Sequence, residues 1–198
     1  MSTLNEGILN FAAKLPEGKP IAAKSLLHLG NRAALDQALS RLARSGKLIR
    51  AGRGLYLQRV EGRFGPRPPT ASSVVEAVAE QRGETVVASG AAEANALGLT
   101  TQVPVREVYL TSGPNRRLRL GAQEIELRHA PAWQLILPGR SAGSAVRALA
   151  WLGRERAHEA LATLPSRLSE RDLQELLGAR ARLPTWMARE VSTLAAHG

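Results

Sequence analysis

The chain has 198 residues, of which 44% are hydrophobic and 22% charged, and its formal net charge is +10. This length accommodates one large domain or two small ones, each with a buried core. The absence of cysteine excludes disulfides, thiol catalysis and cysteine-ligated zinc. The positive charge favours a polyanionic partner, most commonly nucleic acid, with an anionic membrane or an acidic protein as the alternatives.

The positive charge is concentrated in the N-terminal third of the chain. Residues 1–65 hold eleven lysines and arginines against four acidic residues, a net of +7, whereas residues 66–198 hold sixteen against thirteen. Every cation after Lys47 is arginine, a pattern that GC-rich coding also produces. The N-terminus lacks the apolar core of a secretory signal, and no apolar run approaches the ~18 residues of a membrane span. We therefore expect a cytoplasmic protein without a membrane partner.

The first 45 residues carry the signals of three helices. A capping-box pattern at Thr3 and Glu6 opens the first helix, whose apolar residues recur at helical spacing until Pro16. Residues 20–27 predict a second helix, and a turn at Gly30 precedes a third helix over residues 31–45. The apolar stripe of that third helix consists of Leu35, Ala38, Leu39 and Leu42.

A basic hairpin follows the third helix. Residues 47–50 and 55–58 predict two short strands around the turn Ala51-Gly52-Arg53-Gly54. Helix, turn, helix and basic hairpin, in this order, are typical of a winged helix-turn-helix, which places one helix in the DNA major groove and the hairpin, or wing, beside it. We therefore predict an α+β protein with a winged helix-turn-helix domain at residues 1–62, followed by a mixed sheet-and-helix domain.

The remainder of the chain predicts a linker and a second domain. Residues 63–70 are rich in glycine and proline and predict the linker, and residues 71–198 form the second domain. Its predicted helices are 72–81 and 91–97, and its predicted strands are 85–88, 105–111, 117–120 and 123–128. From Ser141 onward we expect about four short helices, broken at Gly153, Pro165 and Pro184.

The third helix and the hairpin supply the candidate DNA-binding residues. Arginine pairs with guanine and glutamine with adenine, so Arg32, Gln37 and Arg41 have the chemistry for base contacts. The hairpin cations would meet phosphates or the minor groove. The alternative is a protein-interaction module in which Arg32 pairs with Asp36, four residues later. The complete predicted set is Arg32, Gln37, Ser40, Arg41, Arg44, Lys47, Arg50 and Arg53.

No constellation of catalytic or metal-binding residues is visible in the sequence. The histidines at positions 28, 129, 158 and 197 are not at ligand spacing from one another or from a carboxylate. The glycine patterns lack the strand-to-helix context of a phosphate-binding loop. We therefore predict no enzyme activity, no catalytic residues, no metal site and no cofactor.

A second arginine cluster, Arg116, Arg117 and Arg119, lies on the predicted hairpin around Gly121-Ala122, and it is either a second polyanion site or a set of cross-strand pairs. In the expected register Arg119 faces Glu124 and Arg117 faces Glu126, and opposite charges across strands stabilise a sheet. This register leaves two arginines without acidic partners, Arg116 and Arg128.

Two segments together resemble the AbiEi-like antitoxins of type IV, abortive-infection E, toxin–antitoxin systems. The first segment is LDQALSRLARSGKLIRAGRGLY, and the second is residues 89–130. Its specific parts are LGLTTQ at 97–102, YLTSG at 109–113 and Gly-x-x-x-Ile at 121–125. The resemblance covers about two thirds of the chain, and the C-terminal helices match only in kind.

The resemblance implies a transcriptional repressor that autoregulates its operon and whose second domain is the antitoxin. The implied partners are operator DNA, expected as an inverted repeat bound by two copies of a monomer, and a nucleotidyltransferase-like toxin encoded nearby. The resemblance implies that Arg32, Gln37, Arg41 and Arg53 bind DNA. It also implies that Arg116 and Arg128 belong to the antitoxin surface. The alternatives are a stand-alone regulator that senses a small ligand and an interaction module without a DNA role.

Overall fold

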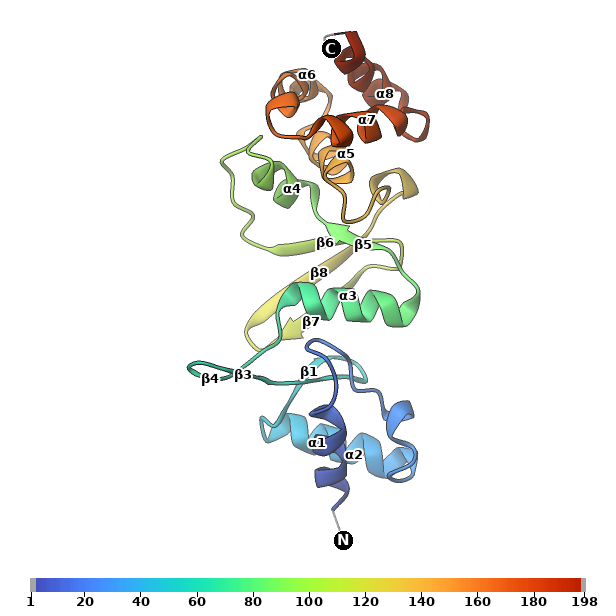
Figure 1. Ribbon diagram of the computed structural model, residues 1–198. Coiled ribbons are helices and arrows are strands. Elements are labelled where there is room, and N and C mark those ends of the chain that lie inside the picture. The colour runs from blue at the N-terminus through green and yellow to red at the C-terminus, as the bar shows by residue number, and fades with distance from the viewer. Residues whose placement is uncertain (1–2, 197–198) are drawn as a thin grey trace. The chain divides into compact units, whose positions relative to one another are not determined.

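The computed structural model describes residues 3–196, which form an α+β protein with two compact units. Unit 1 comprises residues 1–84 and 116–126, and unit 2 comprises residues 85–115 and 127–198. Eight α-helices and eight β-strands, joined by short 3₁₀ turns, lie in the part of the chain that is described (Figure 1). The α+β class predicted from the sequence is confirmed.

Unit 1 begins with two α-helices whose starts follow from their first residues. Helix α1 (Leu4–Ala12) begins at the predicted capping box, in which Thr3 Oγ1 accepts from the Glu6 N–H and Glu6 Oε2 accepts from the Thr3 N–H at 2.8 Å. Helix α2 (Arg32–Arg44) begins after Asn31, whose side chain accepts from the Ala34 N–H at 2.9 Å. The core between these helices includes Ile8, Ala12, Leu35, Ala38, Leu39 and Leu42, all buried.

The prediction of a second helix at residues 20–27 is wrong. Only a 3₁₀ turn, η1 (Ala23–Leu26), forms there. Ile21 is extended instead, and its N–H donates to the carbonyl oxygen of Tyr56 at 2.7 Å. In a helix that starts at Pro20, the Ile21 N–H would point along the helix axis and could not reach Tyr56. The bridge to this distant strand therefore prevails over the preference of Pro20 for a helix start.

Two hairpins follow α2. Strands β1 (Leu48–Gly52) and β2 (Leu55–Gln58) are antiparallel, with Ile49 opposite Leu57 and Arg50 opposite Tyr56. Strands β3 (Val60–Gly62) and β4 (Gly65–Arg67) form the second hairpin, so β4 lies within the range predicted as a linker. At the tip of this second hairpin the side chain of Phe64 is 97% exposed.

Helix α3 (Ala71–Arg82) packs closely on the loop that follows α1. Gly18 has φ +79°, and a Cβ added there would lie 2.5 Å from the backbone of Ser73. Lys19 Nζ lies 2.8 Å from a carboxylate oxygen of Glu80. Only glycine permits both this backbone conformation and this approach, so position 18 fixes how α3 meets the N-terminal helices.

The carboxylate of Glu17 adds a second attachment to the start of α3. It accepts hydrogen bonds from Arg67 Nη1 at 3.0 Å and from the Thr70 N–H at 2.9 Å. These hydrogen bonds, the one from Arg67 first, lower the pKa of Glu17 below its usual 4.5.

Strand β7 (Arg116–Leu120) and the adjacent strand β8 (Gln123–His129), as far as Glu126, complete unit 1. The chain turns between them at Gly121, where φ is +69°. Strand β7 lies against β1, and a Cβ at Gly52 would contact the Leu118 side chain at 3.9 Å. The inward residues of this hairpin, Leu118, Leu120 and Ile125, are buried.

Unit 2 combines short strands with a helical cluster. Strand β5 (Val86–Ala88) is antiparallel to β6 (Glu107–Thr111), with Val87 opposite Leu110, and the last residues of β8 neighbour β6. The α-helices are α4 (Gly90–Ala96), α5 (Ser141–Leu152), α6 (Arg154–Thr163), α7 (Glu170–Gly178) and α8 (Thr185–Ser192). The 3₁₀ turns are η2 (Ala132–Gln134), η3 (Leu164–Ser166), η4 (Arg180–Arg182) and η5 (Thr193–Ala196). The prediction of four helices after Ser141 is confirmed.

None of the helices within residues 3–196 has the length and apolar character that crossing a bilayer requires.

Candidate nucleic-acid interface

Helix α2 presents a polar outward face opposite its buried stripe. Asn31 sets where the helix begins, and the leucines that face α1 fix its rotation. Arg32, Gln37, Arg41 and Arg44 are exposed on the outward side. Among the described residues, the side chains of Gln37, Arg41 and Arg44 have no hydrogen-bond or ion-pair partner, so their donors are available to a ligand.

Two of the predicted residues on α2 already have intramolecular partners. Arg32 Nε donates to Asp36 Oδ2 at 2.9 Å, the pairing considered from the sequence. Both side chains are exposed, and exposed pairs at this spacing contribute only about 0.3–0.5 kcal/mol, so Arg32 can exchange this partner for another anion. Ser40 is half-buried, and its hydroxyl shares a hydrogen bond of 3.1 Å with Tyr56 Oη. Ser40 therefore ties α2 to β2.

The β1–β2 hairpin exposes the three cations assigned to it. Lys47 precedes β1, Arg50 is an exposed position within that strand, and Arg53 lies in the turn. The strand alternates in burial, so Ile49 and Ala51 point inward while Arg50 points outward. Gly54, with φ +68°, completes the turn beside Arg53.

An arginine-rich groove of about 510 Å³ joins this hairpin to the β7–β8 hairpin within unit 1. We call it the arginine groove. Its lining residues are Arg50, Ala51, Gly52, Arg53, Arg117, Arg119 and Glu124. The sequence left two interpretations of Arg117 and Arg119 open, a second polyanion site together with Arg116 or cross-strand pairing with acidic residues. Arg117 and Arg119 are two residues apart on one strand, so the sequence indicated that both side chains lie on the same face of the sheet. The neighbouring residues did not show which segment lies opposite that face.

One carboxylate balances four guanidinium groups in the arginine groove. Glu124 lies 3.7 Å from Arg117 Nε and 3.8 Å from Arg119 Nε, beyond hydrogen-bond distance in both cases. All three side chains are exposed to solvent, where such contacts are weak and screened by salt. The lining of the groove therefore carries a net positive charge.

The prediction that Arg116 has no acidic partner is wrong. Its guanidinium donates to both carboxylate oxygens of Glu84, through Nη1 at 2.8 Å and through Nη2. The two side chains are only 14% and 11% exposed. Glu84 follows α3, far from the hairpin in sequence, so strand register alone could not reveal it. Because Arg116 is committed to this pair, it is not an open surface cation.

Comparison with known proteins places the chain in a family. Residues 8–174 match the Family of unknown function (DUF6088). The chain belongs to this family. A search of curated proteins gave no match, and a search of solved structures gave none. The matched range begins within α1 and ends within α7, so the match includes parts of both units.

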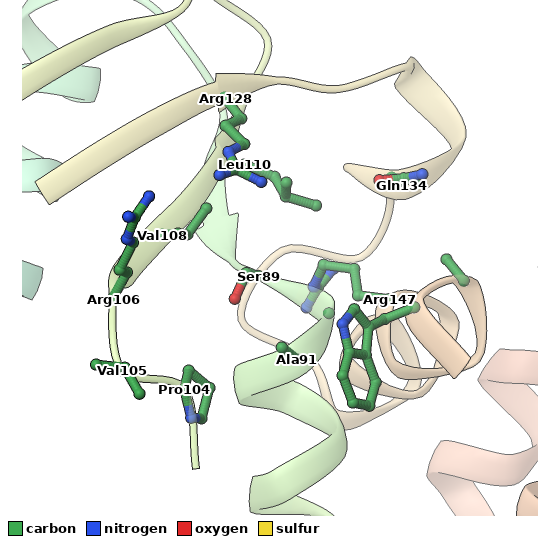
Figure 2. Close-up of a pocket in the computed structure, with 13 residues that line it drawn as sticks. Ser89, Ala91, Pro104, Val105, Arg106, Val108, Leu110, Arg128, Gln134 and Arg147 are labelled. Atoms are coloured by element: carbon green, nitrogen blue, oxygen red, sulfur yellow. The ribbon is translucent and has the colours of Figure 1, made fainter. Parts of the chain in front are cut away.

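Unit 2 of this DUF6088 protein contains a separate cavity of about 480 Å³ (Figure 2). We call it the unit 2 cavity. It is lined by Ser89, Gly90, Ala91, Pro104, Val105, Arg106, Val108, Leu110, Arg128, Gln134, Arg147, Ala150 and Trp151. Arg128, assigned from the resemblance to an antitoxin surface, is thus a wall residue of this cavity. Sequence reasoning missed both the cavity and Arg147.

Arg147 is a buried cation held by several acceptors. Its side chain is 1% exposed, and its Nη2 and Nε atoms lie 3.0 and 3.2 Å from Glu93 Oε1. Its Nη1 atom donates to the carbonyl oxygen of Ile136 at 3.3 Å. Burial lowers the pKa of Arg147, and the charge of Glu93 opposes this shift. The available sequence signal was a lone cation within the otherwise apolar helix α5.

The described histidines form no metal site with their neighbours. Within residues 3–196, no group of three or more histidine and acidic side chains is placed to hold a metal ion. His129 Nδ1 lies 3.0 Å from the carbonyl oxygen of Gly113, and His158 Nδ1 lies 3.6 Å from a carboxylate oxygen of Glu190. His197 lies outside the described residues.

Proposed function

We propose that the domain predicted at residues 1–62 is a winged helix-turn-helix and that this DUF6088 protein is a sequence-specific transcriptional repressor that binds double-stranded DNA. In this proposal α2 is the recognition helix in the major groove, and the β1–β2 hairpin is the wing. The order of α1, η1, α2 and the hairpin supports this assignment, as does the bridge from Ile21 to Tyr56. The exposed polar face of α2 supplies donors suited to base edges.

The arginine groove is the observation that carries the proposal. Duplex DNA presents one negative charge per about 1.7 Å of helix axis, and cations that neutralise its phosphates release condensed counterions. Four exposed guanidinium groups around one carboxylate match such a ligand in charge. An arginine fork also matches the geometry of phosphate oxygens. In the proposal the β7–β8 hairpin therefore extends the phosphate contacts of the wing.

The proposal gives different roles to the two sets of residues. Gln37 and Arg41 have free donors on α2 and would read bases, so they determine sequence preference. Arg53, Arg117 and Arg119 would contact phosphates, which adds affinity without sequence information. Ser40 supports the recognition helix through its hydrogen bond to β2.

Fluorescence anisotropy with the full chain tests these roles. The probes are a duplex from the region upstream of the coding sequence and a shuffled duplex of equal composition, titrated over a range of KCl concentrations. The double variant Arg117→Ala/Arg119→Ala should weaken binding to both duplexes and reduce the slope of log affinity against log salt by about 1.8. Arg41→Ala should weaken binding to the upstream duplex by about 1–3 kcal/mol and binding to the shuffled duplex by less.

The matched control removes the same charge elsewhere. Arg154 and Arg182 are exposed in unit 2, outside both the arginine groove and the unit 2 cavity. Arg154→Ala/Arg182→Ala should leave the salt slope close to that of the unaltered chain. An equal slope change in both double variants would mean that net charge alone acts, and a flat salt response of the unaltered chain would refute the DNA-binding proposal.

A second role, as the antitoxin of its operon, is favoured by the sequence motifs at 97–102, 109–113 and 121–125. We propose it for a chain encoded beside a nucleotidyltransferase-like toxin. Co-expression with that neighbouring gene tests it, because the full chain should restore growth. Arg128→Glu is the informative variant, since Arg116→Glu would break a largely buried ion pair. Failure of the full chain to restore growth would refute the antitoxin role and leave DNA binding unaffected.

A further inference from the structure

The unit 2 cavity has polar walls of one charge sign. Three of its lining residues are arginines, and no aspartate or glutamate is among the described residues that line it. In Figure 2, Arg147 extends from α5 towards Ser89, while Arg128 extends from the end of β8 and Arg106 from the residue just before β6. Guanidinium groups from three separate elements thus surround one space, which favours an anionic occupant.

One of these guanidinium groups is held rigidly in place. Glu93, the carbonyl oxygen of Ile136 and Ser144 Oγ together hold the buried Arg147. Glu93 is not itself a lining residue. Arginine has five N–H donors, and these partners leave one Nη1 hydrogen without an acceptor among the described residues. The position of this charge is therefore fixed beside the cavity without the entropic cost of ordering a mobile side chain.

Neutral polar groups and an apolar wall complete the cavity. Ser89 Oγ accepts from the Ala92 N–H, so its own hydrogen is available for donation. Val108, Leu110 and the Trp151 ring supply apolar surface. A volume of about 480 Å³ lies within the range of sites that enclose a small organic ligand.

We propose that the unit 2 cavity binds a small organic anion that has a flat apolar body and a carboxylate, sulfonate or phosphate group. The anionic group contacts Arg106 and the Ser89 hydroxyl, the buried charge of Arg147 lies behind this wall, and the apolar body lies against Val108 and Trp151. This site is separate from the DNA-binding surface proposed in unit 1, so each proposal can fail without the other.

The probe is 1-anilinonaphthalene-8-sulfonate, an aromatic anion whose fluorescence rises in an apolar site. It should bind the full chain saturably at one molar equivalent. Unlabelled 1-naphthoate should displace it, whereas 1-naphthamide, a neutral compound of nearly the same shape, should be at least about tenfold weaker, because a charged hydrogen-bonding partner changes affinity by about that factor. Equal displacement by both compounds would overturn the requirement for an anion.

Charge-reversal variants locate the probe. Arg106→Glu changes an exposed residue of the cavity wall and should weaken probe binding at least about tenfold. Arg154→Glu, also exposed in unit 2, and Arg119→Glu in the arginine groove remove the same charge elsewhere and should leave probe binding within about twofold. Equal weakening in all three variants would show general attraction to a basic protein and overturn the proposal.

A volume-filling variant tests the same site without changing charge. Ala91 lies on the cavity wall at the start of α4 and is half-buried. Ala91→Trp should abolish saturable binding of the probe while circular dichroism shows an unchanged helix content. Unaltered binding in this folded variant would mean that the probe does not occupy the unit 2 cavity, and the proposal would be rejected.

Discussion

Removing the negative charge of Glu93 would leave Arg147 as an uncompensated cation inside unit 2. Only 1% of the Arg147 side chain and 14% of the Glu93 side chain reach solvent, and their closest contact is 3.0 Å. Burial already lowers the pKa of this arginine. Glu93→Gln retains the shape of the side chain and one acceptor oxygen, so it tests the charge rather than the packing.

The expected loss follows from the burial of both partners. Breaking a buried ion pair at one member costs about 3–5 kcal/mol, because the remaining charge stays desolvated. The glutamine oxygen still accepts a hydrogen bond from Arg147, so we expect Glu93→Gln to lower the free energy of unfolding of unit 2 by about 3 kcal/mol. Arg147→Met removes the buried cation, and the double variant should be less destabilised than the sum of the single variants by about 2 kcal/mol.

The three tryptophans make this measurement specific to unit 2. Trp133, Trp151 and Trp186 all belong to unit 2, and the chain has no others. Urea unfolding followed by tryptophan fluorescence therefore reports this unit, and the change in midpoint at constant slope gives the change in stability. Single effects that add to within about 0.5 kcal/mol in the double variant would refute the coupling.

Three further predictions concern packing, acid sensitivity and capping. A Cβ at Gly90 would lie 2.4 Å from a carbonyl oxygen of α5, so Gly90→Ala should lower the free energy of unfolding of unit 2 by about 1–3 kcal/mol. A Cβ at Gly178 would have nothing within 4 Å, so the control Gly178→Ala should be neutral or stabilising. Equal urea midpoints for the two variants would contradict this prediction. Glu17 has a lowered pKa in the folded chain, so its contribution is present above pH 4.5 and lost as pH falls through the folded value. Glu17→Gln should therefore lower the melting temperature at neutral pH but not in strong acid, and a difference that persists in acid would disprove the assignment. Asn31→Ala should cost about 1 kcal/mol in thermal unfolding followed by circular dichroism, and Asn31→Ser, which retains a cap, much less.

The sequence predicted correctly where a helix begins or ends when that point depends on residues close to it in the chain. The capping box at Thr3 and the N-cap at Asn31 involve contacts three residues apart, and both form as expected. Gly153 ends α5 with φ +76°, a conformation that other residues adopt at a cost. The exposed cations of α2 were predictable in the same way, because one helical period places them opposite the leucine stripe.

Contacts between distant segments could not be predicted from one sequence. Ile21 pairs with a strand 35 positions later, so a proline that favours a helix start gave the wrong element. The arginine groove forms because β7 lies against β1, and no periodicity within either strand specifies that neighbour. The burial of Arg147 could not be predicted for a related reason: two of its acceptors, Glu93 and the carbonyl oxygen of Ile136, come from α4 and from the chain before α5.

Unit 1 is discontinuous in sequence, and this affects how it can fold during translation. The chain leaves unit 1 after Glu84 and returns to it at Arg116. These two residues form an ion pair, which joins the two ends of the intervening segment 85–115. During translation, residues 1–84 leave the ribosome seconds before the β7–β8 hairpin, since synthesis adds about 5–20 residues per second. For that interval one side of β1 lacks the strand that covers it in the folded chain. A gene fragment that stops after the first hairpins would make this transient state permanent, whereas a fragment that replaces 85–115 by a short turn would encode unit 1 as one continuous polypeptide.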